Sequence, residues 1–131
     1  DGSTWRQELA GTAKDFVRLW GTGPNNIVAV GGRSNGMVAR WNGTQWRHEI
    51  LAGEPGLNGI WMNADGVAWL VGERGRILRL ENDDFATVPE PSMNRVLLHG
   101  VFGTEDGYRV TVGGTLGERP PWRGVALETI R

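Results

Sequence analysis

Short apolar segments alternate with turn residues along the whole chain. Segments 27–31 and 67–71 are almost continuously apolar, which is typical of short strands buried on both faces. Segments 5–9 and 46–51 each begin with Trp and continue with a broadly alternating pattern, which is typical of half-exposed strands. No segment repeats apolar residues at the period of an amphipathic helix, and Gly, Pro, Asn or Asp interrupts the chain at short intervals. The pattern therefore predicts an all-β fold.

Two landmarks in this pattern recur at an interval of 41 residues. One is an aromatic residue in the first strand of each unit, and the other is a Val-Gly pair in the second strand. Because both landmarks keep the same spacing, the sequence predicts three structural repeats. The glycine of each pair is expected where a Cβ atom would crowd the backbone. The aromatic residues are Trp20, Trp61 and Phe102, and the pairs are at 30–31, 71–72 and 112–113.

The repeats are predicted to contain four short strands each, except the last, which has three. The expected strands are 16–20, 27–31, 37–41 and 46–51 in the first unit (16–51), and 57–61, 67–71, 76–80 and 85–88 in the second (57–88). The third unit (98–130) holds 98–102, 108–112 and about 125–130, and it lacks a fourth strand of its own. Residues 1–9 align with 42–50, so they are predicted to form a fourth strand with no unit before it. Near the start of the fourth strands stand Trp5, Trp46 and Phe85.

Four antiparallel strands in about 40 residues describe one blade of a β-propeller. We therefore predict that residues 1–131 form one all-β domain with three propeller blades. In such a fold Trp20, Trp61 and Phe102 are expected to fill equivalent buried positions near the start of each blade.

The repeat also resembles a known family of propeller repeats. Its recurring order is Trp, a Gly/Asn/Asp turn, Val-Gly, a Gly-containing loop, Ile-x-Arg and Asn-Gly-x-x-Trp. This order resembles the BNR-like, or sialidase-like, repeats, including those similar to the photosystem assembly factor family, over essentially the whole chain. The Asp-box of those repeats, Ser-x-Asp-x-Gly-x-x-Trp, is half present, because 1–5 and 42–46 keep the turn and the Trp while 82–85 lacks the Gly. The resemblance implies the blade type and leaves the function open.

The pattern suggests how the chain assembles. Propellers have about four to eight blades, so three blades do not close a ring, whereas two copies supply six. Residues 1–9 offer a fourth strand, and the third unit lacks one. The hypothesis is a six-bladed twofold homodimer in which residues 1–9 of each copy complete the partner's third blade. The alternative is that the chain is part of a longer propeller.

Composition narrows the classes of partner. A net charge of −1 does not favour nucleic-acid binding, and no apolar segment is long enough to predict a membrane span. Cys is absent, so disulfides and thiolate metal sites are not expected, and the compartment stays undetermined. Lys14 is the single lysine beside 13 arginines, which are expected to pack on aromatic side chains more often than to bind a ligand.

Candidate catalytic groups are few. His48 and His99 are the two histidines and lie on different predicted strands, so neither a metal site nor a cofactor is expected. Residues 32–36 spell G-x-S-x-G, but the nucleophile elbow requires a helix after the serine, and here a strand is predicted. We therefore predict a protein that is not an enzyme.

The loops between second and third strands carry the candidate binding residues. In a propeller these loops and the connections between blades open on one face, where exposed Trp and Arg favour binding. The expected function is a scaffold that binds a protein or peptide on this face, and the alternative is a lectin-like module. Trp122 either contributes to binding or packs under its own long loop. The candidate residues are Arg33, Ser34, Asn35, Glu73, Arg74, Glu118, Arg119 and Trp122.

Overall fold

Three antiparallel sheets make up the protein, in a computed structural model that describes residues 2–89 and 93–130. The first sheet contains β1 (Phe16–Gly23), β2 (Asn26–Gly31), β3 (Met37–Trp41) and β4 (Trp46–Ile50). The second contains β5 (Leu57–Met62), β6 (Ala68–Gly72), β7 (Ile77–Glu81) and β8 (Asp84–Thr87), with a 3₁₀ turn at Glu73–Gly75. The third contains β9 (Leu97–Gly103), β10 (Arg109–Gly114) and β11 (Gly124–Glu128). The predicted all-β class is confirmed, and the strands predicted within the three units overlap these eleven.

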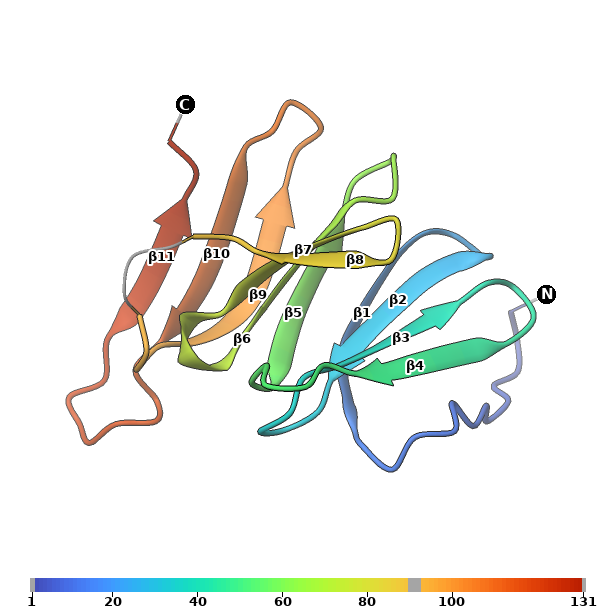
Figure 1. Cartoon of the computed structure of the whole chain (residues 1–131), viewed down its shortest axis with the longest axis horizontal. Helices are drawn as coiled ribbons and strands as arrows, with labels where there is room; N and C mark the ends of the chain where they lie inside the picture. Colours follow the sequence, from blue (N-terminus) through green and yellow to red (C-terminus); the bar gives the residue numbers. More distant parts are fainter. Residues whose placement is uncertain (1, 90–92, 131) are drawn as a thin grey trace.

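Each sheet is a meander in which the strand order follows the chain. The first strands of the sheets lie side by side, since β5 packs against β1 on one side and against β9 on the other. Figure 1 shows the three sheets following one another across the molecule, with the second between the other two. The second sheet is therefore covered on both faces, whereas the outer sheets each leave one face uncovered by described residues.

Apolar side chains from neighbouring sheets fill the space between them. Val28, Val30 and Val38 of the first sheet pack with Leu57, Leu70 and Leu78 of the second, and all are nearly inaccessible to water. A smaller cluster around Val71 and Leu98 joins the second sheet to the third. Burial of these side chains removes apolar surface from water and is what holds the sheets together.

The three repeated aromatic residues share one register position but not one degree of burial. Trp20 is paired with Val28, Trp61 with Trp69, and Phe102 with Val110, each at the same place in its sheet. Trp61 is 4% exposed, whereas Trp20 is 40% and Phe102 55% exposed. The prediction that all three are buried is wrong for the first and the last.

The neighbouring sheet explains this difference. The ring of Trp61 lies over Gly103, where a Cβ atom would come within 2.6 Å of the ring. The residue equivalent to Gly103 in the second sheet is Met62, which has a buried side chain where Gly103 has none. Phe102 belongs to the third sheet, and no further described sheet follows to cover it.

The repeated glycines fulfil their predicted role. A Cβ atom built on Gly31, Gly72 or Gly113 would lie 2.1 Å from a backbone carbonyl oxygen just before, or at the start of, the first strand of the same sheet. Real Cβ atoms do not approach oxygen so closely, so only glycine lets the first and second strands meet here. Sequence repetition thus reflects one backbone contact formed three times.

The fourth-strand aromatic residues differ in their surroundings. Phe85 packs against the core between the first and second sheets, with the Arg40 guanidinium 5.5 Å from its ring centroid. Trp46 contacts Trp41 and Phe16, with ring centroids 5.6 Å and 6.1 Å apart. Trp5 is fully exposed.

The strand predicted at 1–9 is not present in the single chain. Residue 1 is outside the described residues, and residues 2–9 form no strand and are almost entirely exposed. A strand is stable only when another strand accepts its backbone hydrogen bonds. The predicted pairing of this segment with a second copy stays a prediction.

Arginine and tryptophan side chains stack between the second and third sheets. The Arg109 guanidinium lies 3.4 Å from the ring centroid of Trp69 and 5.8 Å from that of Trp61. Burial lowers the pKa of Arg109, the nearby charge of Arg79 lowers it further, and Glu105 acts in the opposite direction. The flat face of the guanidinium against the indole makes this contact a cation–π interaction across the sheet interface.

Replacing Arg109 with lysine is expected to lower the free energy of unfolding by about 1–2 kcal/mol, because an ammonium group keeps the charge but loses the stacked plane. Urea unfolding followed by circular dichroism measures the difference. Arg47→Lys, at an exposed position in β4, is the matched control and should stay within about 0.5 kcal/mol of the unchanged protein. Equal effects of the two changes would contradict a stacking role.

Candidate binding face

Five segments come together at one end of the three sheets and are called the loop face here. They are the loops that follow the second strand of each sheet (32–36, 73–76 and 115–123) and the connections that enter the second and third sheets (51–56 and 93–96). Figure 1 shows the three loops at the lower ends of their sheets. Backbone hydrogen bonds join the first two loops and the two connections, including Gly36 N–H to the Glu54 carbonyl at 2.9 Å and Gly75 N–H to the Val96 carbonyl at 2.8 Å. The third loop is joined to 93–96 by the ion pair between Arg95 and Glu118.

The first loop carries three of the predicted binding residues. Arg33, Ser34 and Asn35 are all exposed, and Ser34 has a positive φ of 66°. The Arg33 Nε donates to Asp15 Oδ2 at 3.3 Å, which ties the loop to the segment before β1. β3 follows this loop as a strand, so the G-x-S-x-G segment lacks the helix of a nucleophile elbow.

The second loop places its two predicted residues differently. Glu73 is partly buried, and its Oε2 accepts a hydrogen bond from the Gly56 N–H at 3.2 Å, so this carboxylate holds the backbone together. Arg74 is exposed with a φ of 58°. Arg74 is therefore available to a partner, whereas Glu73 has a structural contact.

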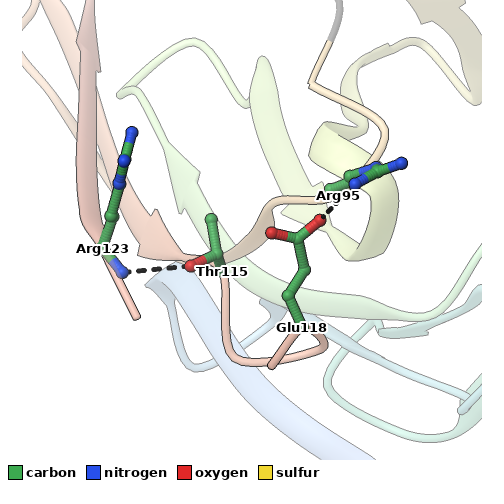
Figure 2. A network of polar contacts seen from close by, with 4 residues as sticks. All are labelled: Arg95, Thr115, Glu118 and Arg123. Carbon is green, nitrogen blue, oxygen red and sulfur yellow. Dashed lines mark hydrogen bonds and ion pairs between the residues drawn. The ribbon is translucent and has the colours of Figure 1, made fainter. Parts of the chain in front are cut away.

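The third loop is the longest and is closed by its own hydrogen bonds (Figure 2). The Arg123 N–H donates to Thr115 Oγ1 at 3.0 Å, and Arg95 pairs with Glu118 at 3.1 Å. The Trp122 indole N–H donates to the Glu118 carbonyl oxygen at 3.1 Å, while 59% of the residue remains exposed. The Trp122 nitrogen thus braces the loop while most of the residue is exposed to water, and its contribution to binding stays a prediction.

One type of ion pair recurs in all three sheets and was not predicted from the sequence. Each of these loops forms an ion pair with the segment that enters its own sheet. The pairs are Arg33–Asp15 at 3.3 Å, Arg76–Glu54 at 2.7 Å and Arg95–Glu118 at 3.1 Å. The third pair has its signs reversed, which hides the relation from a search for identical residues. The loops are therefore braced in the same way at each sheet.

Only part of the predicted site is brought together. A shallow depression between the second and third sheets joins Arg74 and Glu118, and the other residues that line it are Asn94, Arg95, Leu97 and Gly117. Arg33, Ser34 and Asn35 are not part of it. Asn94 and Arg95 were not predicted, because the connection between repeats showed no loop motif of its own.

On the loop face the acidic side chains have partners within the protein, whereas several arginine side chains are exposed. Asp15, Glu54 and Glu118 are engaged with arginine side chains, and Glu73 holds a backbone N–H. Arg74, Arg119 and Arg123 are exposed. Although the whole chain has a net charge of −1, this face presents guanidinium groups and one exposed indole ring to solvent.

Comparison with family models, with curated proteins and with solved structures gives no match to this chain. Within residues 2–89 and 93–130, no group of three or more His, Asp or Glu side chains is arranged to hold a metal ion. His48 in β4 and His99 in β9 lie in different sheets. The described part of the chain also contains no helix with the length and hydrophobicity that a membrane span requires.

Proposed function

We propose that this chain is a non-catalytic binding scaffold whose loop face holds a protein or peptide partner. The observation that carries the proposal is the loop face itself, where three braced loops present Arg74, Arg119, Arg123 and the Trp122 ring to solvent. Fixed loops lose little conformational freedom on binding, so more of the contact energy appears as affinity. Arg and Trp are also the side chains most enriched at binding hot spots.

The scaffold is proposed to be a β-propeller in which the three sheets are consecutive blades. Three features support this interpretation: the meander order within each sheet, the side-by-side first strands β1, β5 and β9, and the repeat of 41 residues. The resemblance to BNR-like repeats points to the same fold. A propeller also explains why loops of one type gather at one end of the sheets.

The chemistry of the face favours a partner that carries carboxylates. Guanidinium groups bind carboxylates in a bidentate geometry. The acidic side chains of the loop face that could compete with a partner's carboxylates, Glu54 and Glu118, already form ion pairs within the protein. Trp122 offers an apolar platform beside these cations. The proposed partner is therefore an acidic peptide segment with an apolar or aromatic side chain.

A lectin-like function is the second candidate, because the exposed Trp122 ring would also stack on the apolar face of a sugar. The loops differ from one sheet to the next, whereas an oligovalent lectin tends to repeat its pocket residues. This difference makes the peptide partner the preferred proposal.

Binding to a peptide array and to a glycan array, measured in parallel, distinguishes the peptide-binding function from the lectin-like one. The chain is expected to bind peptides that contain Asp or Glu with an aromatic residue, and to lose binding when these acids are replaced by Asn or Gln. Arg119→Ala and Trp122→Ala should each weaken binding about tenfold, an effect of the size expected for truncating one contact residue. Arg47→Ala, an exposed arginine in β4 outside the loop face, is the control and should leave the affinity unchanged.

Two outcomes would contradict the peptide proposal. One is binding that is insensitive both to the acidic residues and to the loop-face changes. The other is selective binding to a glycan array that depends on Trp122, which would establish the lectin-like alternative instead.

A further inference from the structure

An apolar cavity of about 320 Å³ lies between the second and third sheets. Trp69, Val71 and Ile77 line it from the second sheet, and Val101 and Leu127 line it from the third. An open cavity with such walls leaves apolar surface in contact with water, which costs free energy. The structure therefore contains an interface between sheets that is only partly filled.

The corresponding space between the first and second sheets is filled by Phe85. The register of the sheets makes Val28, Val30 and Val38 the counterparts of Trp69, Val71 and Ile77. Phe85 lies in β8, the fourth strand of the second sheet, and packs on the core that includes Val28, Val30 and Val38. The cavity is thus the place where a fourth strand of the third sheet would insert its aromatic residue.

The backbone next to the cavity is also unpaired. β11 forms hydrogen bonds with β10 along one edge, and no described residue pairs with its other edge. In the first two sheets the same edge is occupied by β4 and β8. A free strand edge of this kind accepts a further strand readily.

Residues 5–9 have the sequence of the missing strand. Trp5 precedes Trp46 by the repeat interval of 41 residues, and it is fully exposed. Leu9 is 83% exposed and corresponds to Ile50 at the end of β4. Both apolar side chains of this segment are therefore available to pack against another surface.

Aligning residues 5–9 with β4 fixes how they would lie along β11. Trp5 falls opposite Thr129 and Leu9 opposite Val125, so both apolar side chains point to the face that bounds the cavity. Arg6 falls opposite Glu128, which places opposite charges in a cross-strand pair. At the equivalent position of the first sheet Arg40 lies opposite Arg47, which are two like charges. The opposite charges of Arg6 and Glu128 are therefore specific to this pairing and are not a general feature of the repeat.

The linker shows which sheet this strand belongs to. Six residues, 51–56, connect β4 with the first strand of the next sheet, and six residues, 10–15, connect Leu9 with β1. Residues 5–9 are therefore placed to complete the sheet that packs in front of β1. Within one chain the third sheet is on the far side of the second sheet from β1, as Figure 1 shows.

We propose that Trp5 and Leu9 of a second copy of this chain fill the cavity between the second and third sheets, with residues 5–9 pairing along β11. The exchange is reciprocal, so one twofold axis relates the two copies. It also brings the exposed apolar face of each first sheet, which includes Leu19 and Ile50, toward the exposed face of the partner's third sheet with Phe102 and Val112. This proposal is independent of what the loop face binds.

The mass in solution gives the first test. Size exclusion with light scattering should report 28.8 kDa, twice the 14.4 kDa of one chain. Trp5→Ala should raise the dimer dissociation constant at least tenfold, whereas Trp122→Ala, which removes another exposed Trp, should leave it unchanged. A 14.4 kDa species at micromolar concentration, or a dimer indifferent to Trp5→Ala, would overturn the proposal.

Disulfide trapping tests the register and the exchange, and the absence of native Cys gives it a clean background. Opposed residues in an antiparallel pair are close enough for a disulfide bond. When an Arg6→Cys chain and a Glu128→Cys chain are refolded together and oxidised, a covalent dimer should form that neither variant forms alone. Glu8→Cys with Glu128→Cys is the control for register and should not cross-link. If a chain carrying both Arg6→Cys and Glu128→Cys closes the bond within a monomer, the segment folds back on its own chain and the exchange is refuted.

Discussion

Replacing Trp61 with alanine is expected to lower the free energy of unfolding by about 3–5 kcal/mol, the range for removing a large aromatic side chain from a core. The ring is 4% exposed and lies between Gly103 and the Trp69 ring, whose centroid is 5.6 Å away. Removing it leaves a cavity between the second and third sheets and takes away one of the aromatic faces near Arg109. Urea unfolding at one fixed protein concentration measures the loss.

Trp122→Ala is the matched control for this change, because it removes the same side chain from a position that is 59% exposed. Its effect on unfolding should stay below about 1 kcal/mol. If the two substitutions cost the same free energy, Trp61 would not be part of the interface between sheets.

Replacing Gly72 with alanine is expected to destabilise the protein by about 3 kcal/mol, at the upper end of the range for overpacking. The added Cβ would lie 2.1 Å from the Gly56 carbonyl oxygen and 2.9 Å from the Leu57 Cα. Both of these atoms belong to the backbone, so the strands themselves must separate to relieve the clash. The midpoint of thermal or urea unfolding reports the effect.

Gly117→Ala provides the comparison, since a Cβ atom there meets nothing within 4 Å and the φ angle is not positive. It should be neutral or slightly stabilising because alanine restricts the unfolded chain. A Gly72→Ala protein as stable as the Gly117→Ala protein would show that the first two strands of the sheet are not held as closely as described.

The strands could be predicted from the sequence because each carries its own local evidence. The segment 37–41 was predicted with the bounds of β3, and the turn pair at 42–43 correctly separates it from β4. Repetition strengthened weaker segments, such as the one that became β8. Alternation, turn residues and a constant interval are all properties of the sequence itself, so they can be recognised without knowing which sheets pack together.

Burial could not be predicted in the same way, because it depends on what lies opposite. Trp20, Trp61 and Phe102 are equivalent in sequence and register, yet only the middle one meets a glycine on a neighbouring sheet. Likewise the segment containing Trp5 has the pattern of a strand but forms no strand within the described chain. Sequence periodicity identifies a strand and leaves its environment undetermined.

The candidate site was likewise predictable in its position and not in its side-chain contacts. The grouping of loops at one end of the sheets was predicted correctly, because it follows from strand order alone. The use of Glu73 as a backbone acceptor and of Arg95 as the partner of Glu118 was not predicted. Such contacts depend on the distance between loops of different sheets, which no pattern along the chain records.

The covered position of the second sheet has a consequence for how the molecule comes apart. A row of similar units, each touching only its neighbours, behaves as a one-dimensional array in which stability is the sum of unit terms and interface terms. The second sheet contributes to two interfaces, and the first and third sheets to one each. In a single chain we therefore expect unfolding to begin at the outer units and to reach the middle unit last, with β5 and β6, the strands that contact the neighbouring sheets, opening latest.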